Sequence, residues 1–180
     1  MRNAIVAGTI VLSLAAVPAF AQAAKSADQA FVMNAAKGGM AEVELGKLGA
    51  EKASRDEVKK FAQRMADDHS KANDELKTLA QGKGITLPSA VDAKDKATRD
   101  RFAKLSGAAF DRAYMQHMLA DHRKDVAAFK TESTSGKDPD VKAWATKTLP
   151  TLQDHLKMAQ ETANDVGAVG TSGTKKPNRK

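Results

Sequence analysis

The chain has 180 residues and no cysteine, which excludes a disulfide framework, thiolate metal ligands and a cysteine nucleophile. It carries 29 Lys and Arg against 22 Asp and Glu, a formal net charge of +7, but only one Trp and one Tyr on which nucleobases could stack. Without the basic residues near the chain ends, the body of the chain has 24 basic against 22 acidic residues. The five residues near the ends are Arg2, Lys175, Lys176, Arg179 and Lys180. The body is therefore close to neutral, and no nucleic-acid partner is expected.

Residues 1–23 have the pattern of a secretory signal peptide. Arg2 is followed by an uncharged apolar run from residue 4 to residue 17 and then by small residues. This order predicts cleavage after Ala21 or Ala23 and export to the periplasm or beyond. The apolar run is shorter than the ~20 residues that span a bilayer, so a cleaved signal is favoured over a retained membrane anchor.

Residues 24–167 are predicted to form one all-helical domain. Helix formers are abundant, and no segment alternates as a half-buried strand does. "SADQ" from Ser26 and "SRDE" from Ser54 have the spacing of capping boxes, which mark helix starts. "SGKDPD" at 135–140 places Gly136 beyond one helix end and Asp138 at the N-cap of the next. The predicted helices are 26–53, 55–81, 107–133 and 139–166.

The connection between the second and third predicted helices is much longer than the others. It contains a short amphipathic stretch at 92–105 that is predicted to be a minor helix. Such a link can run the length of a bundle, as in the up-down-down-up arrangement of ferritin-like folds. The predicted fold is therefore a ferritin-like four-helix bundle whose crossover carries a short extra helix. A plain up-and-down bundle is the alternative.

Three of the four histidines share the local pattern Asp-His-any-Lys: His69, His122 and His155. At 100° per residue, each lies on or beside the apolar stripe of its helix, whereas the lysine of the pattern faces the opposite side. Each also lies near the midpoint of its helix. The three imidazoles are therefore predicted to share one layer of the bundle core. His117 points away from the stripe.

The first predicted helix places Glu42 at the same height, on a stripe that also contains small residues. One carboxylate and three imidazoles would suit a single Zn, Fe, Mn or Cu ion. The predicted metal ligands are Glu42, His69, His122 and His155. The alternative is a buried polar network in which Glu42 and the histidines satisfy one another or share a trapped water.

Residues 168–180 contain Gly, Ser, Thr and Lys with almost nothing to bury, so they are predicted to be a disordered basic tail. Such a tail could adhere weakly to anionic lipid or cell-wall polymer, or it could be solvated and have no partner.

Four segments together resemble the DUF4142 family of exported bacterial four-helix proteins: "FVMNAAKGGMAEVELGKLGAEKAS", "VKKFAQRMADDHSKANDELKTLAQGKGITLP", "FDRAYMQHMLADHRKDVAAF" and "VKAWATKTLPTLQDHLKMA". The resemblance implies a ferritin-like bundle and a location in the cell envelope, but no established activity. Di-iron proteins of this fold carry Glu three residues before a histidine ligand. Here those positions are Ala66, Leu119 and Leu152, so no di-iron centre is expected.

The sequence therefore favours a non-catalytic envelope or stress-related binding protein. The first rival is a mononuclear metal-binding or redox protein that uses the mid-bundle cluster. The second is an adaptor that docks partner helices or cell-wall polymer. A hydrolase is not expected, because the sequence has no nucleophile elbow, phosphate loop or zinc-protease helix motif.

Overall fold

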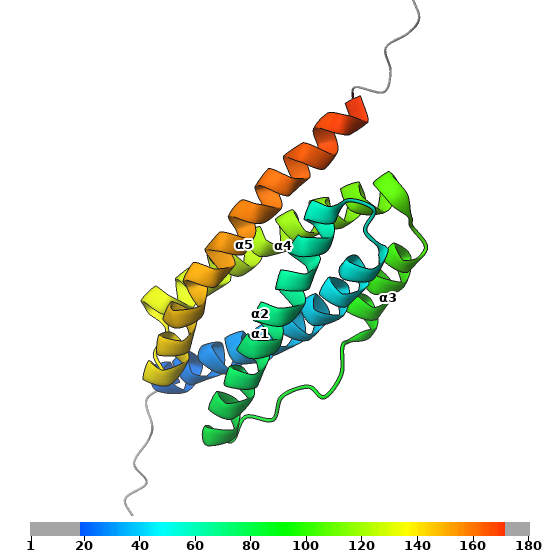
Figure 1. Cartoon of the computed structure of the whole chain (residues 1–180). Helices are drawn as coiled ribbons and strands as arrows, with labels where there is room; N and C mark the ends of the chain where they lie inside the picture. Colours follow the sequence, from blue (N-terminus) through cyan, green and yellow to red (C-terminus); the bar gives the residue numbers. More distant parts are fainter. Residues whose placement is uncertain (1–18, 172–180) are drawn as a thin grey trace, which may run out of the picture.

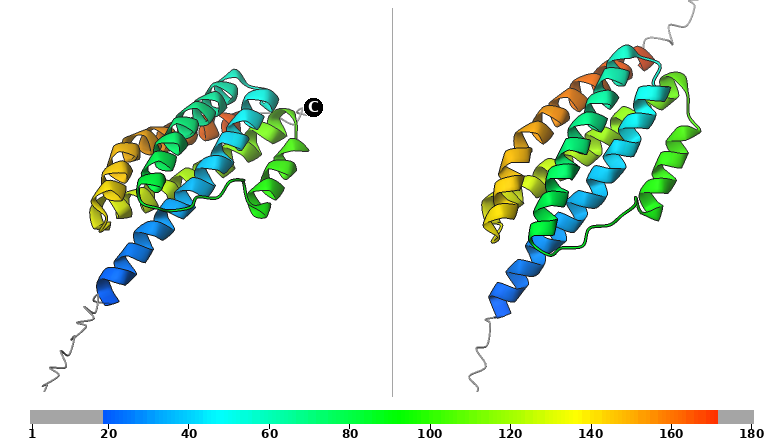
Figure 2. Two further views of the ribbon diagram at one scale, coloured as in Figure 1. Left: turned by 90° about the horizontal axis from the view of Figure 1, so that it is seen from below. Right: turned by 60° about the horizontal axis from the view of Figure 1, so that its bottom comes forward.

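The structure, a computed structural model, describes the backbone of residues 19–171 and the side chains of residues 27–167. Its elements are α1 (Ala19–Lys52), α2 (Asp56–Gly82), α3 (Ala93–Ala103), α4 (Gly107–Ser135) and α5 (Pro139–Thr171). The four long helices form a bundle and the short α3 packs at its side (Figures 1 and 2). Within the described range there is no strand, and no helix is long and apolar enough to cross a membrane. The predicted all-α class is confirmed.

The helices run up, down, down and up. α1 and α2 form one antiparallel hairpin and α4 and α5 form another. Between them, residues 83–106 carry the chain back along the bundle through α3, so that α4 runs in the same direction as α2 (Figure 1). This is the predicted ferritin-like arrangement, and the plain up-and-down alternative is wrong.

The turn between α4 and α5 forms as predicted. α4 ends at Ser135, and α5 begins at Pro139 behind the N-cap Asp138. The Asp138 carboxylate accepts from the backbone N–H groups of Asp140 at 3.0 Å and Val141 at 3.2 Å. The buried carboxylate of Asp28 on α1 accepts from the N–H of Asp138 at 2.6 Å, which fastens this turn to the first helix.

Both predicted capping boxes are wrong. α1 begins at Ala19, because the Ala-rich segment before Ser26 continues the helix, so "SADQ" lies inside α1. At the start of α2 the N-cap is Arg55, which makes no side-chain cap. The N–H and hydroxyl of Ser54 and the N–H of Arg55 instead donate to the carboxylate of Asp111 on α4. Asp111 is fully buried, so its charge-assisted hydrogen bonds outcompete a local cap.

The two chain ends lie outside the described residues. The structure does not describe residues 1–18 of the predicted signal peptide or residues 172–180 of the predicted tail. The last helix continues to Thr171, beyond its predicted end at 166.

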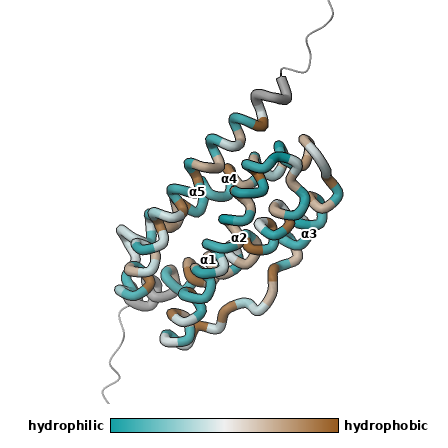
Figure 3. Tube along the Cα trace, viewed as in Figure 1, coloured by the Kyte–Doolittle hydropathy of each residue, from teal (hydrophilic) through white to brown (hydrophobic). Residues whose placement is uncertain are grey.

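The core has two apolar clusters, and the histidines lie between them. The first cluster includes Met65, Met118 and Ala159, and the second includes Leu76, Phe129 and Leu152. Along α2, α4 and α5, each histidine falls between one residue of each cluster. Hydrophilic and hydrophobic residues are interspersed along each helix (Figure 3), and the hydrophobic residues of these clusters are buried in the core.

Candidate metal centre

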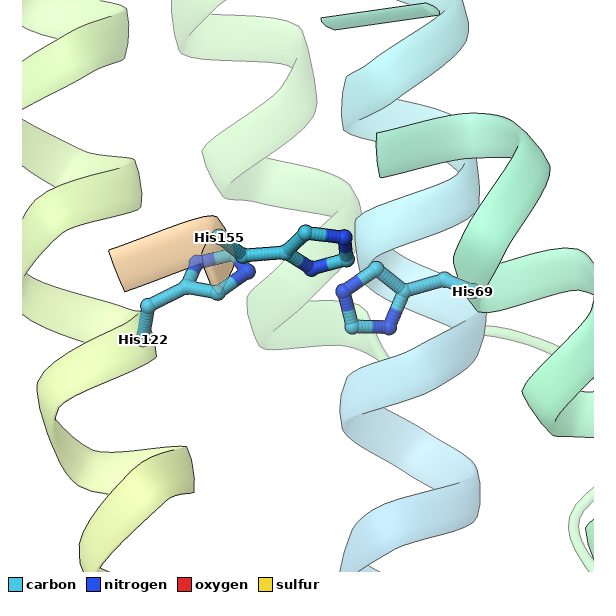
Figure 4. Close-up of side chains that lie close together, drawn as sticks. All are labelled: His69, His122 and His155. Carbon is cyan, nitrogen blue, oxygen red and sulfur yellow. The ribbon is translucent and has the colours of Figure 1, made fainter. Parts of the chain in front are cut away.

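The imidazoles of His69, His122 and His155 meet in the middle of the bundle (Figure 4). They come from α2, α4 and α5, and their exposed fractions are 7%, 0% and 1%. The ring centroids are 5.6 Å apart for His69 and His122, and 5.4 Å apart for each of the other two pairs. One ring nitrogen from each lies within 4.8 Å of the others. The predicted shared layer is confirmed.

His122 and His155 each make a hydrogen bond through the ring nitrogen that points away from the other imidazoles. His122 Nδ1 lies 3.0 Å from the carbonyl oxygen of Met118, which can only accept, so Nδ1 carries the proton and donates it. His155 Nε2 lies 2.8 Å from Oδ2 of Asp68 and donates to that carboxylate in the same way. These bonds fix the tautomers and leave a lone pair on His122 Nε2 and on His155 Nδ1. Metal-binding histidines are commonly oriented in this manner.

Three buried ring nitrogens have no hydrogen-bond partner among the described residues: His69 Nε2, His122 Nε2 and His155 Nδ1. An unsatisfied buried polar atom costs about 1–3 kcal/mol, so three of them in one layer need a common explanation. The rings do not satisfy one another, which argues against a polar network closed by the histidines alone. A cation between the lone pairs would satisfy all three nitrogens.

The spacing allows a metal ion after a small contraction. For three nitrogens at most 4.8 Å apart, the centre lies about 2.8 Å from each, whereas a zinc–imidazole bond is about 2.0–2.1 Å. Each ring must therefore approach by ~0.7 Å or less for an ion in the plane of the three nitrogens, and by slightly more for a tetrahedral ion. Side-chain torsions can supply a movement of this size without moving the helices.

Burial keeps the cluster neutral. Burial, together with the neighbouring imidazoles, lowers the pKa of His69 to about 3 and that of His122 to about 4. Burial also lowers the pKa of His155, although Asp68 acts in the opposite direction. For Asp68, burial acts to raise the pKa, but the hydrogen bonds from His155 and Arg64 outweigh it and lower it. The three imidazoles are therefore neutral near pH 7, which is the form of histidine that can bind a metal.

The structure does not bring Glu42 into this set. The carboxyl group is buried on α1, and its Oε1 lies 3.9 Å from His122 Nδ1, the nitrogen that donates to the Met118 carbonyl. Burial, followed by repulsion from Asp125, raises its pKa well above the ordinary range. Glu42 thus lies behind the His122 ring, on the side away from the other two imidazoles, and does not converge with the three ring nitrogens. Helical periodicity placed it at the correct height but could not decide which side of the ring it would face.

The aspartates of the three Asp-His-any-Lys patterns have different roles, which the sequence pattern does not distinguish. Asp68 reaches across from α2 to His155 on α5. Asp121 pairs at 3.0 Å with His117, one turn earlier on α4 and outside the cluster. Asp154 is exposed. The lysines are exposed at all three positions, as predicted: Lys71, Lys124 and Lys157.

Fold and site together define a ferritin-like helical bundle with a buried cluster of three histidines, toward which no carboxylate of residues 27–167 converges. The chain belongs to DUF4142, a domain of unknown function whose family model matches residues 14–162. The solved structure of a DUF305 fragment from Deinococcus radiodurans is similar, with a TM-score of 0.68 at 12% sequence identity, over 77% of this chain and 96% of that one. At this identity the similarity supports the fold alone. No curated protein matches the sequence significantly.

Proposed function

We propose that the protein binds one transition-metal ion through His69 Nε2, His122 Nε2 and His155 Nδ1. The observation that carries the proposal is the convergence of three buried, unpartnered nitrogens, two of them on rings whose other nitrogen is already held. If the cluster were purely structural, trapped water would have to satisfy these three nitrogens instead. A bound cation supplies the missing partner for each.

The donor chemistry favours Zn²⁺ or Cu²⁺. Imidazole suits these borderline ions, whereas Mg²⁺, Ca²⁺ and Mn²⁺ prefer carboxylate and carbonyl oxygen. With three protein donors, a tetrahedral ion would keep a further position for a ligand from outside the chain. The ionised Asp68 behind His155 would offset part of the positive charge of the ion.

The proposal places this metal-binding protein in the cell envelope. That location is supported by the signal-peptide pattern of residues 1–23. N-terminal sequencing of protein recovered from the expressing cells tests it. A mature chain that begins at Gln22 or Ala24 supports export, and an intact Met1 contradicts it.

Metal titration tests the site itself. Chelator-treated protein is dialysed and titrated separately with Zn²⁺ and Cu²⁺, and we expect one equivalent of tightly bound ion. His69→Leu, His122→Leu and His155→Leu each replace a ligand with an apolar side chain that suits the surrounding core, and each should lose the tight site. His117→Leu is the matched control, because the fourth histidine is paired with Asp121 outside the cluster, and it should bind like wild type.

Circular dichroism of each variant confirms that the bundle is intact before binding is compared. The proposal is wrong if folded wild-type protein binds less than about a tenth of an equivalent of either ion. It is also wrong if the three cluster variants bind as tightly as His117→Leu.

A further inference from the structure

A cavity of about 140 Å³ lies beside the histidine layer, between α1, α2, α4 and α5. His69 and His155 form part of its wall. Phe31, Phe129 and Trp144 also line it, and they form an aromatic group with centroid distances of 4.9 Å for Phe31 and Phe129 and 5.3 Å for Phe129 and Trp144. A protein cavity of ~150 Å³ can hold benzene, so this one has room for a ligand about the size of a six-membered ring.

The charged residues of the cavity wall are all acidic. Asp68 and Asp125 line it, and no Lys or Arg does. Asp68 already accepts hydrogen bonds from His155 and Arg64. Asp125 is partly buried and has no hydrogen bond or ion pair with any residue in the described range, and burial raises its pKa to about 6. The carboxylate of Asp125 therefore has no partner among the described residues, although burial makes an unpaired charge unfavourable.

The wall chemistry selects a cation with an apolar body. An ammonium group would satisfy the Asp125 carboxylate through a charge-assisted hydrogen bond. The faces of Phe31, Phe129 and Trp144 attract cations and also accept apolar carbon. Anions are disfavoured, because they would meet two carboxylates and no basic side chain.

We propose that this cavity binds a small organic amine in its protonated form, with Asp125 as the counter-ion and Phe31, Phe129 and Trp144 around its carbon skeleton. The site is separate from the proposed metal function, because none of these contacts requires a metal ion. The same acidic wall could instead conduct a metal ion toward the histidines, and the test below separates the two uses.

The protein contains its own reporter for this binding. Trp144 is the only tryptophan of the chain and lies in the cavity wall, so its fluorescence responds to ligand entry. Metal-free protein at pH 8 is titrated with cyclohexylamine, which is protonated there, and with cyclohexanol, a neutral molecule of the same size. We expect a saturable change in fluorescence with both molecules. The amine should bind at least about tenfold more tightly than the alcohol, because a hydrogen bond to a charged group contributes that much affinity.

Three variants separate the contribution of charge from that of space. Asp125→Asn keeps the shape of the wall and should remove the advantage of cyclohexylamine without weakening cyclohexanol. Gly38 lines the cavity, and a Cβ there meets no atom within 4 Å, so Gly38→Leu should fill the space and abolish binding of both probes. Gly167→Leu is the matched control, since that helical glycine is equally uncrowded but does not line the cavity, and it should bind like wild type.

Equal affinity of wild-type protein for the amine and the alcohol overturns the proposal, as does an Asp125→Asn variant that still prefers the amine. Absence of any saturable response in wild type overturns it too. If Asp125→Asn slows Zn²⁺ uptake and leaves cyclohexylamine binding unchanged, the cavity is a metal entry route and not an amine site. Failure of the metal centre would leave all the metal-free measurements intact, so the two proposals fail separately.

Discussion

Replacing Asp68 with Asn is expected to weaken Zn²⁺ binding about tenfold without abolishing it. The carboxylate accepts from His155 Nε2 at 2.8 Å, which fixes the ring so that Nδ1 faces the other two imidazoles. Mutation of the partner that orients a metal ligand typically weakens metal binding by about 10–100-fold. The Asp68 side chain is 33% exposed, so solvent screens its charge and the lower end of that range applies. Tenfold corresponds to about 1.4 kcal/mol.

A second substitution at the same position separates charge from orientation. The Asn amide oxygen can still accept from His155 Nε2, so Asp68→Asn removes the charge but keeps the ring in place. Asp68→Ala removes both, and we expect a loss nearer to about 100-fold. Competition between the protein and a chromophoric chelator of known Zn²⁺ affinity at pH 7.5 measures both variants against wild type.

The matched control is Asp154→Asn, which changes the aspartate of another Asp-His-any-Lys pattern. Asp154 precedes His155 directly in the chain but is exposed. We expect its variant to bind Zn²⁺ within about twofold of wild type, as surface charges have small effects. Equal losses in Asp68→Asn and Asp154→Asn would refute the reasoning, because the contact across the bundle would then have no more effect than a nearby surface charge.

Three further predictions follow from the geometry. Asp111→Ala should lower the free energy of unfolding by about 3 kcal/mol, because three donors on Ser54 and Arg55 lose their shared acceptor. Ser54→Ala removes one of these donors and should lower it by about 1 kcal/mol. Urea unfolding measures both, and equal losses would contradict the account. Glu42→Gln should leave the bound Zn²⁺ at one equivalent in calorimetric titration, because its carboxyl lies beside the protonated nitrogen of His122; loss of uptake would return Glu42 to the ligand set. A lowered histidine pKa means that the neutral, metal-binding form persists to lower pH. The pKa is about 3 for His69 and about 4 for His122, so protons should compete with Zn²⁺ only below about pH 5. Ordinary histidines would lose the ion from about pH 6.5 downward. Protein equilibrated with Zn²⁺ at pH 5.5 should therefore retain the ion, and protein at pH 3.5 should release it. Full release at pH 5.5 would show that the ligands are more basic than their burial implies.

Helix periodicity was sufficient to predict the histidine layer. The position of each histidine along its helix gives its height, and 100° per residue gives its direction, so His69, His122 and His155 could be assigned to one buried layer. The turn at 135–140 was predictable for a similar reason, because Gly136, Asp138 and Pro139 act on the backbone within a few residues of themselves. Such signals depend on local geometry alone.

The partners of these residues were not predictable in the same way. His155 and Asp68 are 87 residues apart in the chain, and Ser54 and Asp111 are 57 apart. The "SRDE" pattern is a sound local signal that fails because the carboxylate of Asp111 on another helix accepts from the N–H and the hydroxyl of Ser54, which the capping box would use. Glu42 has the right height, but its side relative to the His122 ring depends on how α1 and α4 pack.

The sequence by itself determined the helical class, the long crossover and the depth of three imidazoles in the bundle, because each follows from a short repeat or a turn signal along one helix. Only the tertiary structure decided which ring nitrogens face one another, that Asp68 orients His155 and that Asp125 and Trp144 share a cavity. Those relations depend on the rotation and separation of packed helices, and a shift of an ångström between helices changes which atoms can meet.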